Sequence, residues 1–315
     1  MGFRKIDYNI LFASTLDHFA SSYYLFLAPI LAPLFFEGHN EFLQLVLYFS
    51  HIGISFIIKP LAVIIFSKIV EKYGVEVSLI LSLFGINLCN LITAILPEYS
   101  KIGILSSLSL IFLRLSSTMF SSAESFISKL YILEAKEGKS ELRASYYYPF
   151  FSSAGAILAS IAATIYTDNF RIYFLVSSII GFGLLIHRIK HFHGFRTKTA
   201  EDISLKNLMR NFSVVIRIII LTGVSYITWY VPFIYLNSVV PIVTEIKEAE
   251  FAASSTIILL LDLALIPLIG KFLENKNYKF FMKLSSIMLS LSFIIFIPNI
   301  PKIFLPPSLI FQGIT

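Results

Sequence analysis

Residues 59–78 read KPLAVIIFSKIVEKYGVEVS, and this stretch decides the fold. It ends one long apolar segment, passes through a short charged turn at 67–74 and begins the next apolar segment. Two lysines and one glutamate stand in that turn, between segments that are each long enough to cross a bilayer. The rest of the chain repeats the same unit of span, short loop and span. This pattern predicts an all-α, polytopic membrane protein.

The composition indicates that lipid is the solvent for most of the chain. Of the 315 residues, 57% are hydrophobic and 14% are charged, against about 25% charged in soluble domains. The net charge of +6 does not indicate nucleic-acid binding, because the basic residues stand in short loops between apolar spans. Cys89 is the only cysteine, so the sequence contains neither a disulfide framework nor a Cys/His metal cluster. We therefore expect no metal and no cofactor.

Nine segments are long and apolar enough to cross the hydrocarbon core as helices, which takes about 20 residues. They are continuous apolar runs, whereas strands of a membrane barrel alternate over about ten residues. The nine predicted spans are 10–36, 42–66, 77–97, 102–130, 144–166, 170–187, 213–240, 251–270 and 280–298. A tenth begins near Ile303, so the expected fold has about nine to ten transmembrane helices.

The distribution of positive charge predicts the orientation. With a cytoplasmic N-terminus, the inside loops hold 19 of the 25 Lys and Arg residues and the outside loops hold four. The remaining two, Lys59 and Arg114, lie within spans. Because cytoplasmic loops are enriched in Lys and Arg, the asymmetry predicts a multi-pass protein with its N-terminus in the cytoplasm. It also supports the number of spans, since one missed helix would invert the alternation.

A basic segment at 188–212 divides the chain into two halves. We expect a six-helix N-terminal bundle at 1–187, a cytoplasmic linker at 188–212 and a C-terminal bundle at 213–315. That second bundle is incomplete, with three full spans and part of a fourth. The turn SKIVEK at 67–72 and the loop GKFLEN at 270–275 occupy the same place in each half. Parallel halves of this kind are typical of one class of transporter.

Polar residues follow one face of the predicted span 102–130. They are Ser107, Arg114, Ser117, Thr118, Ser121, Ser125 and Ser128, spaced by three, four or seven residues. An arginine at the centre of a membrane helix costs at least about 2.5–3.5 kcal/mol on insertion scales, so it should face protein or water and have a partner. Arg114 either binds a substrate carboxylate or pairs with Asp17, and a purely structural ion pair stays open.

Five further residues are candidates for the substrate or proton pathway. Asp17 and His18 are candidates to bind or relay a proton near the inner side of the first span, and the alternative for each is a residue at the inner interface without such a role. Glu124 lies ten residues after Arg114, about 15 Å along the helix, so the two cannot pair. Asp262 is the only acid within a predicted span of the second half. Trp229 stands on an aromatic face that suits a quaternary ammonium group. The alternative role for this aromatic face is packing between helices.

Several of these motifs resemble the major facilitator superfamily, and within it the metabolite:proton symporters related to bacterial proline/betaine transporters. Lys68, Lys72 and Gly74 match the gate loop between the second and third spans, and Glu71 replaces an Asp. The sequence Leu16-Asp17-His18-Phe19 is similar to the family's Leu-Glu-aromatic-Tyr-Asp-Phe, although Ala20 replaces the second acid. Arg114 and Glu124 match the family's motif in span four.

The resemblance implies a carrier of two bundles around a central cavity. Its expected function is proton-coupled symport of a small solute across the bacterial inner membrane, such as proline, betaine or a related osmolyte or carboxylate. It assigns Asp17, Arg114 and Glu124 to the cavity or to coupling. It assigns Lys68, Glu71, Lys72 and Gly74 to a cytoplasmic gate loop. The expected partners are the solute, protons and lipid, and not nucleic acid.

The sequence also bears on three other interpretations: an enzyme, a non-transporting remnant and one part of a larger assembly. An enzyme is not expected, because the sequence has no HExxH, no phosphate-binding Gly-rich loop and no GxSxG. A remnant that inserts without transporting is the rival reading. It rests on the altered gate loop, and on a resembling family that has twelve spans where this sequence stops within a tenth. A third reading is assembly with a separately encoded remainder of the C-terminal bundle.

Overall fold

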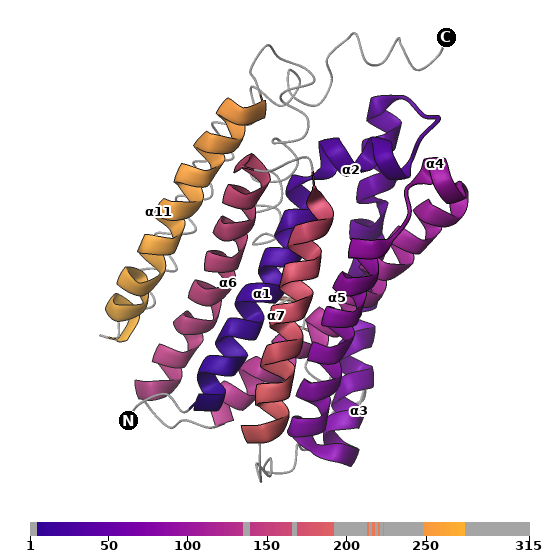
Figure 1. The fold of residues 1–315 in the computed structure, drawn as a ribbon. Coiled ribbons are helices and arrows are strands. Elements are labelled where there is room, and N and C mark those ends of the chain that lie inside the picture. Colours follow the sequence, from indigo (N-terminus) through magenta and orange to yellow (C-terminus); the bar gives the residue numbers. More distant parts are fainter. Residues whose placement is uncertain are drawn as a thin grey trace.

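The computed structural model describes residues 5–134, 139–165, 169–191 and 248–274, with isolated positions between 213 and 223 (Figure 1). Every regular element in these ranges is a helix. The helices are α1 (Lys5–Phe26), α2 (Ala28–Phe35), α3 (Glu41–Ile95), α4 (Tyr99–Ile102), α5 (Ile104–Glu134), α6 (Lys139–Ile165), α7 (Phe170–His191) and α11 (Glu248–Glu274). The all-α prediction is confirmed for this part of the chain. The predicted spans at 280–298 and beyond, and nearly all of 213–240, lie outside the described residues.

Three of these helices are by themselves long and apolar enough to cross a membrane: α3, α5 over Ile104–Ile132, and α7. Helices α1 and α2 meet the same criterion together, and a bend of 70° separates them. The bend follows from the sequence at its site. Pro29 lies in the first turn of α2, where a missing N–H is tolerated and where a proline favours the start of a new helix.

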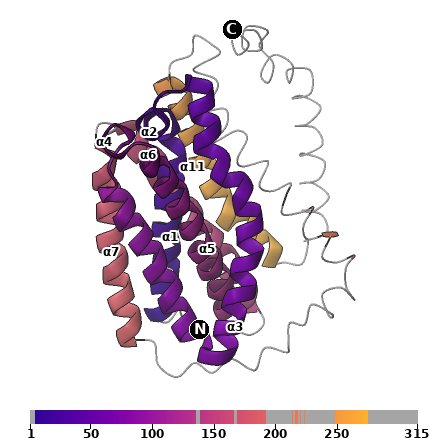
Figure 2. The same ribbon diagram turned by 90° about the vertical axis from the view of Figure 1, so that its right-hand side faces the viewer.

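Helix α3 is two antiparallel arms that reverse direction at Gly74. That residue has φ 88° and ψ 168°, a conformation that is open to glycine and strained for other residues. Tyr48 and Ala94, near the two ends of α3, belong to one apolar cluster, and Figure 2 shows the two arms running upward from their common end near the label α3. The predicted loop at 67–74 is wrong in extent. Residues 67–73 continue the first helical arm, so the turn is confined to Gly74.

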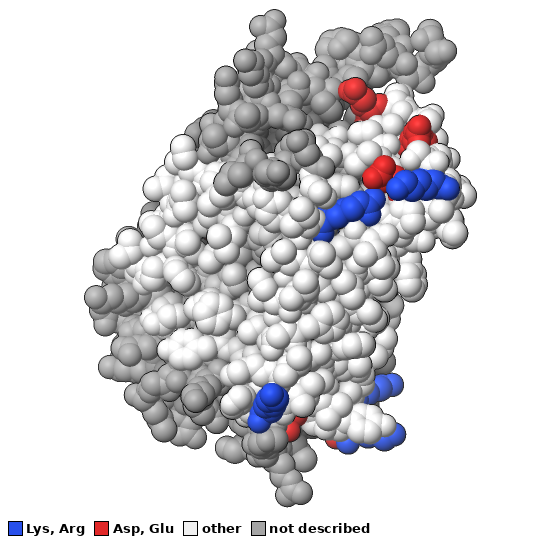
Figure 3. All heavy atoms as spheres, viewed as in Figure 1, with Lys and Arg blue, Asp and Glu red and all other residues white. Residues whose placement is uncertain are grey.

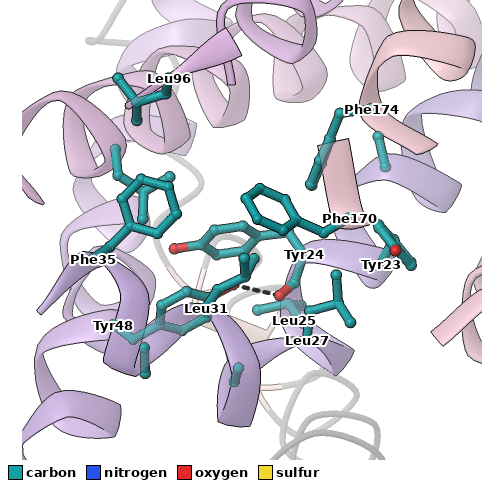
Figure 4. Close-up of a cluster of buried hydrophobic side chains, with 14 of the residues drawn as sticks. Tyr23, Tyr24, Leu25, Leu27, Leu31, Phe35, Tyr48, Leu96, Phe170 and Phe174 are labelled. Carbon is teal, nitrogen blue, oxygen red and sulfur yellow. Dashed lines mark hydrogen bonds between the residues drawn. The ribbon is translucent and has the colours of Figure 1, made fainter. Parts of the chain in front are cut away.

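Two apolar clusters fill the interior of the bundle. The first lies toward α2 and α4 and is rich in aromatic rings, among them Tyr24, Phe35 and Tyr48 (Figure 4). The second lies near Gly74 and joins α1, α3, α5 and α6 through residues such as Phe66 and Val75. These clusters bury parts of α1, α3, α5, α6 and α7.

The outer surface of the bundle is apolar at mid-height. Large side chains such as Ile57, Phe112 and Ile179 are at least 60% exposed. In the view of Figure 3, the charged residues gather at the two ends of the molecule and leave an uncharged band between them. A surface of this kind suits a lipid environment. The chain is a membrane-embedded helical protein.

Helix α11 packs along α6. The hydroxyl groups of Ser160 and Thr256 are hydrogen-bonded at 2.6 Å, and Gly270 lies against the ring of Tyr146. This contact joins the described helix of the second half of the sequence to the first bundle (Figure 1).

Candidate functional site

A cavity of about 1160 Å³ lies between α1, the first arm of α3 and α5, and Pro149 of α6 also contributes to its wall. Its charged and titratable lining residues are Asp17, His18, His51, Lys59, Arg114 and Lys129. Ser117, Thr118 and Ser121 of the predicted polar stripe also line the cavity, together with apolar residues such as Ile52 and Val63. The cavity therefore gathers Asp17, His18 and Arg114, three of the predicted pathway residues.

The aromatic cluster covers one end of the cavity. Tyr24 and Tyr48 are stacked with ring centroids 4.4 Å apart, and the Tyr48 hydroxyl donates to the Tyr24 carbonyl oxygen at 2.5 Å (Figure 4). His51 meets the Tyr24 ring edge-on at 5.2 Å. Toward the Gly74 end, the lining residue Lys129 is exposed. The cavity thus runs from a buried aromatic end to an accessible basic end.

Arg114 lies at the aromatic end with only 4% of its surface exposed. Its Nη2 donates to Thr93 Oγ1 at 2.7 Å, and its guanidinium carbon lies 4.5 Å from the centroid of the Tyr24 ring. The ring of Phe174 is also near, at 5.3 Å. The Nε–H of Arg114 is buried without a hydrogen-bond partner. In the described ranges, no acidic side chain lies within ion-pair distance of this guanidinium.

Asp17 lies on α1, nearer the accessible end than Arg114. The Ser121 hydroxyl donates to its Oδ2 at 2.5 Å, whereas Oδ1 is buried without a partner. Ser121 is seven residues after Arg114, about 10.5 Å along α5. Asp17 therefore does not pair with Arg114, so that alternative from the sequence is wrong. The neighbouring His18 donates through Nδ1 to the Ser14 carbonyl oxygen at 2.9 Å.

Glu124 lies outside the cavity lining, in a buried ion pair with Arg188 of α7. Their Oε1 and Nη2 atoms are 2.8 Å apart, and the exposed fractions are 1% and 0%. Arg188 also donates to Asn9 Oδ1 at 2.9 Å and to the Leu79 carbonyl oxygen at 2.7 Å. The Ser82 hydroxyl donates to Glu124 at 2.6 Å. These contacts tie together α1, the second arm of α3, α5 and α7.

Arg188 was missed by the sequence analysis, which counted it as a charge of the basic linker. It stands inside α7, one turn from the end of that helix, and is fully buried. Its signal in the sequence is weak: Arg188 stands between Ile186 and Ile189 at the end of an apolar run, and its partner Asn9 immediately precedes the predicted first span.

The remaining predicted site residues lie away from the cavity. Asp262 is exposed on α11 and is not among the lining residues. Lys68, Glu71 and Lys72 are exposed at the end of the first arm of α3, immediately before Gly74. Trp229 lies outside the described residues.

These features define an α-helical membrane protein with a cavity between its helices that runs from a buried aromatic end to an accessible basic end. No protein-family model matches the sequence, and no solved structure matches the chain. The similarity to known proteins comes from curated relatives.

Over 178 residues the chain is 21% identical to the glycine betaine/proline/ectoine/pipecolic acid transporter of Dickeya dadantii, covering 56% of the chain and 34% of that protein. It is 22% identical over 270 residues to a Staphylococcus aureus protein whose name provisionally assigns it to proline/betaine transport. This match covers 80% of the chain and 58% of that protein. It is 21% identical over 168 residues to the proline/betaine transporter of Escherichia coli, and this match covers 53% of the chain and 32% of that protein. The chain thus spans about a third to three fifths of the length of these relatives.

Proposed function

We propose that this protein is a secondary transporter that moves a small carboxylate-bearing solute through the cavity. Three properties complete the proposal: proton-coupled symport, a major-facilitator arrangement of two bundles, and residence in the bacterial inner membrane with a cytoplasmic N-terminus. The names of the relatives support solute transport, and the observation that carries the proposal for this chain is the state of Arg114.

Arg114 is a buried cation without an acidic partner in the described part of the chain. A guanidinium carries five N–H donors in a rigid fork that matches a carboxylate. Thr93 accepts from Nη2, and the Nε–H is buried without an acceptor. A buried charge without a counter-ion is costly, so an anionic group of the solute is the natural partner. The aromatic end of the cavity then holds the carboxylate of the solute.

Asp17 is the proposed coupling residue. It is the acid in the cavity lining, its Oδ1 has no partner, and His18 follows it on α1. An intramembrane acid with an unsatisfied oxygen is a suitable proton carrier in a transporter. The distance along α5 between its partner Ser121 and Arg114 keeps the proton site apart from the carboxylate site.

Gly74 is the proposed hinge of the gate loop. It reverses α3 within a single residue, and Lys68, Glu71 and Lys72 present their charges to solvent just before it. The charges at this end are mainly basic, and Glu37, Glu41 and Glu98 lie toward the other end with Lys101 and Arg171. This asymmetry supports a cytoplasmic position for the Gly74 end.

Uptake by the full chain reconstituted in liposomes tests the proposal. We expect accumulation of labelled proline, glycine betaine or succinate that increases with an inward proton gradient. Arg114→Ala should abolish it, whereas Lys101→Ala, an exposed cation outside the cavity, should leave it unchanged. Uptake no greater than that of empty liposomes would refute transport by this chain and leave an inserted, non-transporting protein.

A further inference from the structure

The charges that line the cavity are unequal in sign. Among the described lining residues, Lys59, Arg114 and Lys129 are basic, and Asp17 is the single acid. From this excess, and on the basis of the proposed transport function, we infer that the cavity selects solutes with a net negative charge. Its preferred ligands are carboxylates without a compensating ammonium group, rather than the zwitterions for which the relatives are named.

The basic residues are distributed along the whole cavity. Lys129 lies fifteen residues after Arg114 on α5, about 22 Å along the helix, and its Nζ is 5.1 Å from the ring centroid of Tyr148. Lys59 lies eight residues after His51 on α3, and its Nζ is 5.9 Å from the ring centroid of Phe56. Positive charge therefore stands at the accessible end as well as at Arg114. A cavity lined by one sign of charge between apolar walls raises the local concentration of the opposite ion.

Asp17 is badly placed to receive the ammonium group of a short zwitterion. A solute that seats its carboxylate on Arg114 would need its cation to reach Ser121 and Asp17, about 10.5 Å farther along α5. Helical side chains also lean toward the N-terminus of their helix, which moves the Arg114 guanidinium away from Ser121. Proline and glycine betaine hold their two charges one carbon apart, so they cannot span this separation.

The second half of the sequence supplies little further acid. Within the predicted spans 213–240, 251–270 and 280–298, Asp262 is the single acidic residue, and it is exposed on α11 away from the lining. An ammonium group beside Arg114 would therefore meet no described carboxylate other than the distant Asp17. A second carboxylate or a neutral group fits the same space without the cost of placing a second positive charge beside Arg114.

Two solutes of nearly equal length test the inference. Succinate and 4-aminobutyrate share one carboxylate and differ at the other end, which is a carboxylate in the first and an ammonium group in the second. We expect the full chain in lipid nanodiscs to bind succinate at least about tenfold more tightly than 4-aminobutyrate or glycine betaine. Lys59→Gln and Lys129→Gln should each reduce this ratio by roughly threefold, whereas Lys101→Gln, outside the cavity, should not change it.

The possible results separate the two proposals. Uptake and binding of glycine betaine or 4-aminobutyrate as tight as that of succinate would overturn the inference and leave the transport function standing. A succinate preference unaffected by both lysine substitutions would overturn the assignment of selectivity to these residues. Absence of binding for all three solutes, together with absence of uptake, would overturn the proposed function itself.

Discussion

The buried pair of Glu124 and Arg188 allows a quantitative prediction. Arg188→Met removes both contacts to the Glu124 carboxylate, at 2.8 and 3.1 Å, and the donors to Asn9 and to the Leu79 carbonyl. It leaves a carboxylate that is 1% exposed with no counter-ion in the described ranges. Breaking a buried ion pair from one side costs about 3–5 kcal/mol of unfolding free energy.

Removing both charges should cost much less. In the double variant Glu124→Gln with Arg188→Met, the amide can still accept from Ser82, and no charge remains buried. Replacing a whole buried pair by neutral groups is often close to neutral, so we expect a loss within about 1–2 kcal/mol of the wild type. The coupling between the two substitutions should then be several kcal/mol in favour of the pair.

Cys89 provides the assay for this cycle. It is the only cysteine in the sequence and is 6% exposed, so labelling by a fluorogenic maleimide during heating reports unfolding. Each single variant should label at a clearly lower temperature than the double variant. Arg171→Met is the matched control, because the Arg171–Glu98 pair is about 30% exposed and such pairs contribute about 1 kcal/mol or less. Single variants as stable as this control would refute the stabilising role of the Glu124–Arg188 pair. A double variant whose loss of unfolding free energy equals the sum of the two single losses would also refute it.

Three more substitutions test separate features. Gly74→Ala should lower the free energy of unfolding by about 1–3 kcal/mol in the same labelling assay, because φ 88° is strained for alanine. The control is Gly53→Ala: Gly53 is helical and also lies in open space, so this variant should not be destabilised. Gly155→Ala should unfold the bundle at lower temperature, by roughly 2 kcal/mol or more, because its Cβ would lie 2.2 Å from a backbone oxygen of α1; unchanged labelling would contradict that packing. Thr93→Val should raise the KM for uptake roughly tenfold, because it removes the hydrogen bond that holds the Arg114 guanidinium. An unchanged KM would refute the role of Thr93 in positioning Arg114.

The helical architecture of the first half could be predicted from apolar length and loop charge alone. Each of the first six predicted spans corresponds to a described helix, to the α1–α2 pair or to one arm of α3. The reason is that a run of about 20 apolar residues has few alternatives in lipid. The polar stripe of α5 was also predictable, because residues three, four and seven apart share a helical face. Arg114, Ser117 and Ser121 do line one cavity.

The pairing between helices could not be predicted, because the sequence does not specify the relative heights of two spans. Asp17 and Arg114 both lie within membrane helices, yet the packing of α1 places Asp17 beside Ser121 instead. Arg188 was assigned to the linker, because a charge at the end of an apolar run is counted as solvated unless its partner is known. Its partners come from α1, α3 and α5, which are distant in the sequence.

The stacked rings of Tyr24 and Tyr48 have a consequence for the kinetics of passage. They lie between the Arg114 end of the cavity and the side of the bundle where α2 and α4 stand, and a hydrogen bond joins them. On the proposed function, a solute that leaves the cavity at this end must part these rings and break the bond between the Tyr48 hydroxyl and the Tyr24 backbone. Opening at the α2 end would then be a discrete event with its own barrier, and its rate would set an upper limit on the proposed turnover.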